Sequence, residues 1–243
     1  MAEPFLSIII PAHNEERRLP NTLEQACVFI QEQDYQVEVL IVDNASQDQT
    51  LQIATEFAAT HSGFRVLQEP ERGKGMAVRR GMLAARGAYR FMCDADFSMP
   101  IAQINRFLPP QLTDFDVAIA SREAPGAIRY DEPAYRHIVG RLFNLLIRVI
   151  ALPEFHDTQC GFKCWKAEAA EALFARQTLP GWSFDVEILF IARKWGYRIV
   201  ELPIPWYFNA DSKVSVLRDS FQMAVDLLKI RLNAIQGRYH AEI

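Results

Sequence analysis

Two aspartates separated by a single residue, Asp94 and Asp96, follow an apolar run at 89–93 that predicts a buried strand. Because alternate residues at a strand end can direct two carboxylates to one hard cation, the pair predicts a site for Mg2+ or Mn2+ with further coordination positions open. A diphosphate can fill those positions, and the metal then neutralises charge developing on it as a leaving group. Isolated D-x-D sequences are commonly solvated loop carboxylates, so it is the place after a buried strand that favours the metal site.

Further polar residues stand where two other predicted strands end. Residues 11–15 (PAHNE) close the first strand, and Asp43 closes the second. In open α/β sheets ligands bind beyond the carboxyl ends of the strands, so these residues and the aspartate pair are expected to share one site. Asp43 is suited to accept hydrogen bonds from a base or a ribose. The alternative is a helix cap, because Asn44, Ser46 and Asp48 precede a helical pattern.

Two other groups of charged residues can contribute to such a site. The sequence RGKG at 72–75 places a flexible turn and two cations before a predicted helix, which suits phosphate binding although it is too short for a Walker loop. Asp185 and Glu187 stand two apart at the start of another helical run. The helix macrodipole alone favours carboxylates there, whereas a sugar hydroxyl as acceptor would make one of them a general base.

The elements that must position these residues alternate along the first half of the chain. Nearly continuous apolar runs, as buried parallel strands require, cover residues 6–11, 37–43, 64–67, 89–94 and 116–121. Between them, apolar residues recur at helical spacing, as in Leu19, Leu23, Cys27 and Ile30. The order β-α-β-α-β-α-β predicts an α/β fold with an open, mostly parallel sheet that carries helices on both faces.

The second half has a different pattern. An amphipathic segment at 135–152 precedes a polar loop at 154–163, a helix at 184–195 and a strand at 198–203. The last segment carries an apolar stripe made of Leu217, Phe221, Ala224, Leu228, Leu232 and Ile235. We predict a single domain over residues 1–243, with a change of character near residue 122.

Composition bounds the function. A chain of 243 residues, half of them hydrophobic, can bury a full core, which excludes a disordered or fibrous protein. The formal net charge of −4 offers no general attraction to nucleic acid, so we expect no nucleic-acid partner. The four cysteines lie in apolar or helical runs, and no basic signal region precedes the first strand. These features favour a cytoplasmic protein.

The segment at 135–152 combines apolar residues with cations. Arg141 and Arg148 are flanked by Leu142, Leu145, Leu146, Val149 and Ile150. Such a helix can lie in a membrane interface while its cations meet anionic headgroups, and the C-terminal stripe is a second candidate for this peripheral contact. An ordinary core helix and a contact within a homo-oligomer have the same periodicity. The apolar run is too short to span a bilayer.

The motifs together resemble a known family. PAHNEE at 11–16, Asp43, GKG at 73–75 and DAD at 94–96 resemble the family-2 inverting glycosyltransferases in order and approximate spacing. The resemblance implies the GT-A fold, a nucleotide-diphosphate sugar donor and Mg2+ or Mn2+. In the second half, DTQCGFK at 157–163 and WSFDVE at 182–187 are similar to the polyprenyl-phosphate branch of this family. Within that branch the chain resembles the dolichyl-phosphate β-glucosyltransferases more closely than the dolichyl-phosphate mannosyltransferases. Residues 1–122 would then be the nucleotide-sugar-binding half and residues 123–243 the acceptor-side half.

Three departures from the family pattern bear on the substrate. His13 stands where the family often has Tyr, and Asn44-Ala45-Ser46 replaces the commoner Asp-Gly-Ser, but neither removes a metal ligand. After the aspartate pair, Phe97-Ser98 lacks the Gln that the mannosyl branch places second, and this favours glucose over mannose.

By resemblance, the site residues take several roles. Nucleotide binding is assigned to Pro11, Ala12, Glu15, Asp43, Lys74, Asp94 and Ala95, and metal binding to Asp94 and Asp96. The acceptor phosphate is assigned to Arg122, Arg136 and Lys213, and the donor sugar or its phosphates to Gln159 and Lys163. Catalytic residues are expected among Asp94, Asp96, Arg122, Asp185 and Glu187.

These assignments predict an inverting transfer of a hexose, first of all glucose from UDP-glucose, to a polyprenyl or dolichyl phosphate at the cytoplasmic face of a membrane. A phosphate monoester is already anionic, so it can attack the anomeric carbon without a strong general base. The alternatives are GDP-mannose as donor, a glycan hydroxyl as acceptor, a nucleotidyltransferase that makes nucleotide sugars, and a non-catalytic binding module. The nucleotidyltransferase usually has a Gly-rich phosphate loop after its first strand, which this sequence lacks.

Overall fold

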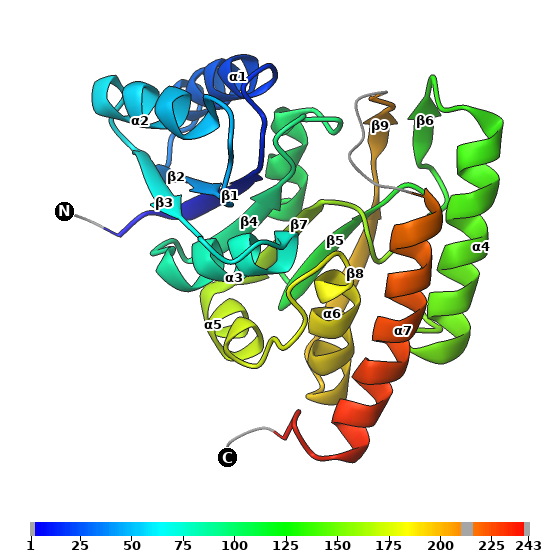
Figure 1. Cartoon of the computed structure of the whole chain (residues 1–243). Coiled ribbons are helices and arrows are strands. Elements are labelled where there is room, and N and C mark those ends of the chain that lie inside the picture. Colours follow the sequence, from blue (N-terminus) through cyan, green and yellow to red (C-terminus); the bar gives the residue numbers. More distant parts are fainter. Residues whose placement is uncertain (1–2, 210–215, 241–243) are drawn as a thin grey trace.

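A seven-stranded sheet runs through the computed structural model, which describes residues 3–209 and 216–240 (Figure 1). The strands are β1 (Leu6–Ala12), β2 (Val37–Asp43), β3 (Phe64–Gln68), β4 (Tyr89–Cys93), β5 (Val117–Ser121), β7 (Phe162–Lys166) and β8 (Ile199–Pro203). They lie in the order β3-β2-β1-β4-β7-β5-β8. β7 is antiparallel to β4 and β5, and the other neighbouring pairs are parallel.

Successive residues of the central strands point to opposite faces of the sheet and so fill two apolar layers. Ile8 and Ile10 of β1 belong to one layer, whereas Ile9 between them belongs to the other. The first layer is covered by α1 (Leu19–Gln31), α2 (Thr50–Thr60) and the 3-10 helix η1 (Ile101–Phe107). The second is covered by α3 (Lys74–Ala84), α5 (Ala167–Ala175) and α6 (Phe184–Lys194). The predicted α/β sheet with helices on both faces is confirmed.

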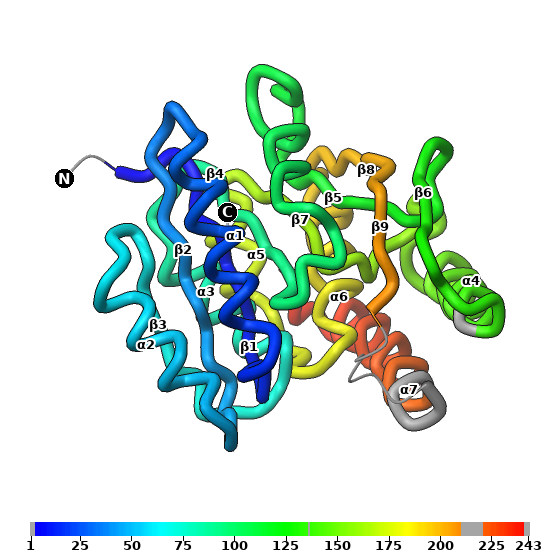
Figure 2. The backbone as a smooth tube through the Cα atoms, turned by 90° about the horizontal axis from the view of Figure 1, so that it is seen from above, coloured from blue at the N-terminus to red at the C-terminus, as the bar shows by residue number. Residues whose placement is uncertain are grey.

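Four elements extend the second half beyond the main sheet. β6 (Ile128–Tyr130) and β9 (Pro205–Tyr207) pair in parallel as a separate two-stranded sheet. α4 (Ala134–Ile150) and α7 (Val216–Ile235) lie side by side at one edge of the molecule (Figures 1 and 2). Ile147 anchors α4, and Leu227 and Ile230 anchor α7, in the second apolar layer. The two helices thus form a wall beside the sheet.

β7 corrects the expectation of a polar loop over residues 154–163. The loop ends at Gly161, and Phe162 begins a strand that is inserted between β4 and β5. This strand is short and contains Lys163, so its sequence lacks the continuous apolar character of a buried strand. The structure buries it because Asp185 pairs with the lysine ammonium at 2.8 Å.

The apolar stripe on the last helix faces outward where its side chains are described. Phe221, Leu228, Leu232 and Ile235 are exposed, Ile235 by 82%. α7 packs against the rest of the protein through other residues, among them Leu227 and Ile230. Within the described ranges no helix is both long enough and apolar enough to cross a membrane.

Candidate active site

A pocket of about 320 Å3 is lined by residues that directly follow β4 and β5. Lys74, Asp94 and Asp96 contribute one part of its lining. Arg122, Gln159 and Asp185, which are distant in the sequence, contribute another. The pocket therefore brings together four of the charged residues that were predicted to bind donor, metal or acceptor, namely Lys74, Asp94, Asp96 and Arg122, and adds the catalytic candidate Asp185.

Lys74 begins α3 and reaches the residue that follows β4. Its Nζ lies 2.5 Å from Oδ1 of Asp94. The glycines on either side keep this helix start in close contact with its surroundings, since a Cβ on Gly73 would lie 2.2 Å from the carbonyl oxygen of Pro180 and a Cβ on Gly75 would lie 2.8 Å from neighbouring atoms. Gly73 also has a φ of 144°, which side-chain-bearing residues rarely adopt. The GKG sequence therefore fixes where the lysine points.

Burial and charge act against each other in this part of the pocket. Burial alone would lower the pKa of Lys74, but the carboxylates of Asp94 and Asp185 outweigh it and the pKa is raised. For Asp96, burial and then the charge of Asp94 raise the pKa, while the backbone N–H of Ser98, donating to Oδ1 at 3.0 Å, acts in the opposite direction. A cation shared by the two aspartates would relieve their repulsion.

The donor set fits Mg2+ or Mn2+. Asp94 and Asp96 line the same pocket and repel each other through their charges. Mg2+ is typically bound by one or two carboxylates together with substrate phosphates and water, and not by a cage of protein ligands. Residues 3–209 and 216–240 contain no cluster of three or more His, Cys, Asp or Glu side chains that could hold a metal.

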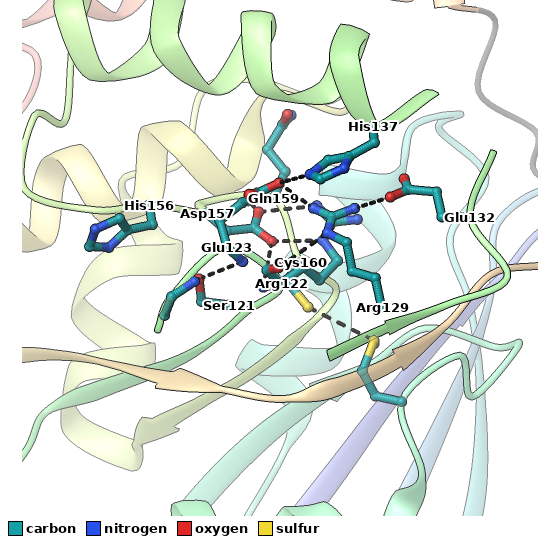
Figure 3. A network of polar contacts seen from close by, with 12 residues as sticks. Ser121, Arg122, Glu123, Arg129, Glu132, His137, His156, Asp157, Gln159 and Cys160 are labelled. Carbon is teal, nitrogen blue, oxygen red and sulfur yellow. Dashed lines mark hydrogen bonds and ion pairs between the residues drawn. The ribbon is translucent and has the colours of Figure 1, made fainter. Parts of the chain in front are cut away.

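Arg122 directly follows β5 and is held by Asp157, whose side chain is fully buried (Figure 3). Nε and Nη2 of Arg122 donate to the carboxylate oxygens of Asp157 at 2.7 and 3.0 Å, and the backbone N–H of Arg122 donates at 3.1 Å. Burial raises the pKa of Asp157, but this pairing prevails and lowers it to about 2. Since the pairing uses Nε and Nη2, the N–H groups of Nη1 can serve a ligand in the pocket.

Arg129 of β6 lines the same pocket, although it is not among the residues predicted from the sequence. It donates to the carboxylates of Glu123 and Glu132 and, at 3.1 Å, to the backbone oxygen of Arg122 (Figure 3). The guanidinium carbons of Arg122 and Arg129 each lie 5.6 Å from the ring centroid of Trp206. The pocket thus contains two arginines braced by carboxylates and one indole. A strand of three residues has no periodicity that the sequence could have revealed.

Asp185, at the start of α6, lines the pocket, whereas Lys163 lies beneath its wall. Lys163 Nζ donates to Oδ1 of Asp185 at 2.8 Å and to the carbonyl oxygen of Cys160 at 2.5 Å. Its side chain has no exposed surface and is not part of the lining. Burial raises the pKa of Asp185, and the charges of Lys163 and Lys74 oppose that rise. Gln159 lines the pocket, and its contact with the donor stays a prediction.

Glu187 is not brought to the pocket. Its carboxylate is fully buried and accepts from the backbone N–H groups of Thr178 and Leu179, from the Thr178 hydroxyl and from the Tyr239 hydroxyl at 2.6 Å. These bonds tie α6 to Thr178 and Leu179 and to Tyr239, which follows α7. Glu187 was a candidate catalytic residue, and the structure gives it a structural role because its oxygens are already engaged.

The expected nucleotide side is built by β1, β2 and the turns after them. Pro11 and Ala12 end β1 beside Val42 and Asp43 of β2. Asp43 is 4% exposed, and its Oδ1 has no hydrogen-bond partner within the described residues. A buried carboxylate oxygen without a donor is costly unless a ligand supplies one, so this atom suits a base or ribose donor.

Glu15 and Ala95 contribute to this side in different ways. Glu15 pairs with Arg18 at 2.6 Å, and Arg18 approaches Asp96 at 3.7 Å, so Glu15 is linked to the metal-binding pair through one arginine. Ala95 is buried, and its carbonyl accepts from the hydroxyl of Thr22 on α1 at 2.5 Å. Both residues therefore support the position of the aspartate pair.

Asn44, which follows β2, holds the turn before α3 through its side chain. Its side-chain nitrogen donates to the carbonyls of Glu69 and Glu71, at 3.1 and 2.7 Å, and its side-chain oxygen accepts from the N–H of Gly73 at 2.8 Å. These three bonds hold the turn that presents Lys74. Asn44 stands where the resembled family commonly has Asp, and a carboxylate could not donate to the two carbonyls.

Two predicted acceptor-phosphate residues lie where the structure gives no side-chain description. The backbone of Arg136 belongs to the first turn of α4, but its side chain is not described. Lys213 lies outside the described residues.

Comparisons with known proteins agree with this architecture. A model of the family described as Glycosyl transferase family 2 matches residues 7–174. Dolichyl-phosphate beta-glucosyltransferase of Dictyostelium discoideum is 32% identical over 247 residues, covering 96% of this chain and 76% of the relative. The Drosophila melanogaster protein of the same name is 33% identical over 252 residues, covering 96% and 76%.

Among solved structures, glucosyl-3-phosphoglycerate synthase from Mycobacterium tuberculosis in complex with Mn2+, UDP-glucose and phosphoglyceric acid has a TM-score of 0.66. It is 18% identical, and the match covers 97% of this chain and 80% of that chain. At this identity the likeness concerns the fold alone, and it confirms the predicted GT-A arrangement.

Proposed function

Because this chain belongs to glycosyl transferase family 2, we propose that it transfers glucose from UDP-glucose to a polyprenyl phosphate such as dolichyl phosphate, with inversion at the anomeric carbon. The two relatives, at 32 and 33% identity over 96% of the chain, are named for this sugar and this acceptor class. The observation that carries the proposal is the pocket itself, which contains two aspartates with a lysine and, separately, two arginines.

The first charge group is assigned to the donor. Asp94 and Asp96 would hold Mg2+ or Mn2+, which when bound neutralises the diphosphate of the donor and stabilises it as a leaving group. Lys74 would bind the same diphosphate, since its raised pKa keeps it cationic beside the aspartates. Asp43 would accept a hydrogen bond from the base or ribose, and Gln159 would meet the sugar.

The second charge group is assigned to the acceptor. Arg122 is held by Asp157 at one edge of its guanidinium, so it can present its remaining N–H groups to a phosphate without losing its orientation. Arg129, held by Glu123 and Glu132, has little freedom to move and can offer the remaining N–H groups of Nη1 and Nη2 to the same phosphate. The bound phosphate monoester then attacks the anomeric carbon directly, and orientation and charge stabilisation account for the rate.

The acceptor phosphate needs no strong general base, and Asp185 is poorly placed to be one. Its carboxylate is engaged by Lys163 at 2.8 Å and attracted by Lys74. A base that must abstract a hydroxyl proton works best when it is not committed to a cation. This favours a phosphate over a sugar hydroxyl as the nucleophile.

An apolar wall beside the arginines suits a lipid-linked phosphate. Tyr135, Val139 and Phe143, spaced one helical turn apart on α4, line the pocket together with Trp206. Gly140 also lines it, and a Cβ built there would meet no atom within 4 Å. We assign this face of α4 to the first isoprene units of the acceptor.

The outer faces of α4 and α7 suit a membrane surface. Leu142 and Val149 on α4 are exposed by 70 and 74%, and Phe221 on α7 by 74%. Arg141 and Arg148 stand among the exposed α4 residues, which is the pattern of a helix that lies in the interface with its cations at anionic headgroups. We propose peripheral contact with the cytoplasmic face of a membrane, which would bring a lipid acceptor to the pocket.

The assay that tests the proposed function supplies the purified protein with Mn2+, labelled UDP-glucose or GDP-mannose, and one of three acceptors: polyprenyl phosphate, free polyprenol or 3-phosphoglycerate. We expect label in the lipid fraction only with UDP-glucose and polyprenyl phosphate. Transfer to free polyprenol would contradict the phosphate nucleophile, transfer to 3-phosphoglycerate would contradict the lipid acceptor, and a preference for GDP-mannose would contradict the donor.

A further inference from the structure

Gly161 lies directly against the carboxylate of Asp94. A Cβ built on Gly161 would come 1.9 Å from Oδ2 and 2.6 Å from Oδ1 of Asp94. The backbone reinforces this packing, because the N–H of Asp94 donates to the carbonyl oxygen of Gly161 at 3.1 Å. The φ of Gly161 is not in the left-handed region, so glycine is required here by space and not by backbone conformation.

A buried ion pair holds the peptide on which Asp94 rests. Lys163 Nζ donates to the carbonyl oxygen of Cys160 at 2.5 Å and to Asp185 at 2.8 Å. The lysine and aspartate side chains are 0 and 4% exposed. Desolvating two charges is expensive, and such a pair adds little stability compared with an apolar pair of similar volume. The geometry that this pair fixes is the position of the Cys160–Gly161 peptide, and both residues of that peptide line the pocket.

We propose that Gly161, fixed by the Lys163–Asp185 pair through the carbonyl of Cys160, is a positioning residue that sets where the Asp94 carboxylate stands and thereby how tightly the pocket binds Mg2+ or Mn2+. This inference rests on the proposed use of a metal at Asp94 and Asp96. It gives Lys163 an indirect role in place of the donor contact expected from the sequence.

The size of the effect follows from the contact distances. Ordinary van der Waals contact begins at 3.4 Å, so a methyl group on Gly161 would displace Oδ2 of Asp94 by about 1.5 Å. Metal–ligand distances are held to within about 0.2 Å, so this carboxylate could no longer coordinate in its original place. Changes in residues that support metal ligands typically weaken metal binding roughly 10–100-fold, and we expect a loss in this range.

Gly161→Ala tests the first link, with Gly181→Ala as the matched control. Gly181 receives the same methyl group, but its Cβ would meet no atom within 4 Å. Mn2+ binding is measured by electron paramagnetic resonance in the presence of UDP, and thermal unfolding reports on the fold. We expect weaker Mn2+ binding for Gly161→Ala, unchanged binding for Gly181→Ala, and similar unfolding midpoints. Equal Mn2+ affinity for Gly161→Ala and the unaltered protein would overturn the proposal.

The double variant Lys163→Met with Asp185→Leu tests the second link without leaving a buried charge unpaired. Because Asp185 also lines the pocket, the matched control is Asp185→Asn, which removes the same carboxylate charge but keeps an oxygen that can accept from Lys163. We expect the double variant to keep its stability and to bind Mn2+ more weakly than this control. Equal Mn2+ affinity for the double variant and the control would overturn the role of the pair. If the unaltered protein itself binds no Mn2+ with UDP present, the proposed metal dependence fails. This outcome differs from failure of the positioning role, because the unaltered protein and every variant then show no Mn2+ binding.

Discussion

Replacing Asp157 by Asn removes the charge that holds Arg122 while keeping the shape of the side chain. Asp157 is fully buried and accepts from three N–H groups of Arg122 and from the backbone of Gln159. The amide can accept fewer of these bonds and cannot balance the guanidinium charge. We therefore expect both a less stable protein and a weaker hold on the acceptor phosphate.

The magnitude follows from the pKa. Folding lowers the pKa of Asp157 from its ordinary 3.8 to about 2, which corresponds to about 2.5 kcal/mol of stability at pH 7. Because the pKa is lower in the folded state, this stability is present above pH 4 and is lost as the pH falls towards 2. At pH 3 about 1 kcal/mol of it should already be gone.

Urea unfolding of the unaltered protein and of Asp157→Asn, at pH 7 and at pH 3, measures this contribution to the free energy of unfolding. The free energy of unfolding of Asp157→Asn should be about 2.5 kcal/mol lower than that of the unaltered protein at pH 7, and this difference should be about 1 kcal/mol smaller at pH 3. Asp114→Asn serves as control, because its pair with Arg198 is largely exposed and surface pairs contribute about 0–1 kcal/mol. A free-energy difference that is the same at both pH values, or no larger than that caused by Asp114→Asn, would refute the proposed contribution of Asp157.

Three further predictions concern the acceptor and the membrane. Arg129→Met should raise the KM for polyprenyl phosphate by about tenfold in initial-rate assays, because it removes about one charge-assisted hydrogen bond to the acceptor, and should leave the KM for UDP-glucose unchanged. A changed KM for UDP-glucose alone would contradict the assignment of Arg129 to the acceptor. Gly140→Leu should fill the apolar wall and lower kcat/KM for long-chain polyprenyl phosphate by about tenfold without lowering the unfolding midpoint, and equal turnover would remove that wall from the acceptor path. Leu142→Asp with Val149→Asp should lower co-sedimentation with anionic vesicles by about tenfold, and undiminished binding would place membrane contact elsewhere.

The donor side of the site could be predicted from the sequence for a physical reason. Buried parallel strands are continuous apolar runs, and the polar residues that end them are brought to one edge of the sheet by topology alone. This predicts the places of Asp43 and Asp94 at the ends of β2 and β4, whereas Lys74 was predicted from the RGKG turn before a helix. The close packing of Gly161 on Asp94 could not, because a steric contact between distant segments leaves no periodic trace.

The acceptor side was harder to predict because its elements are short or depend on tertiary pairing. β7 contains a lysine that is buried only because Asp185, 22 positions later, neutralises it. β6, which carries Arg129, is three residues long. Glu187 had the same helix-start position as Asp185 in the sequence, but the two side chains point to different surroundings. The sequence shows two carboxylates at the start of this helix, but their spacing does not predict which of them lines the pocket.

The central claim is that Asp94 and Asp96 together bind a cation that bridges to the donor diphosphate. Its most direct test is to titrate Mn2+ into the unaltered protein and the Asp94→Asn, Asp96→Asn double variant with UDP-glucose present, and to follow glucose transfer to polyprenyl phosphate in the same samples. The account predicts that the double variant loses at least about 100-fold in both Mn2+ affinity and turnover. A double variant that transfers glucose at nearly the unaltered rate would contradict it.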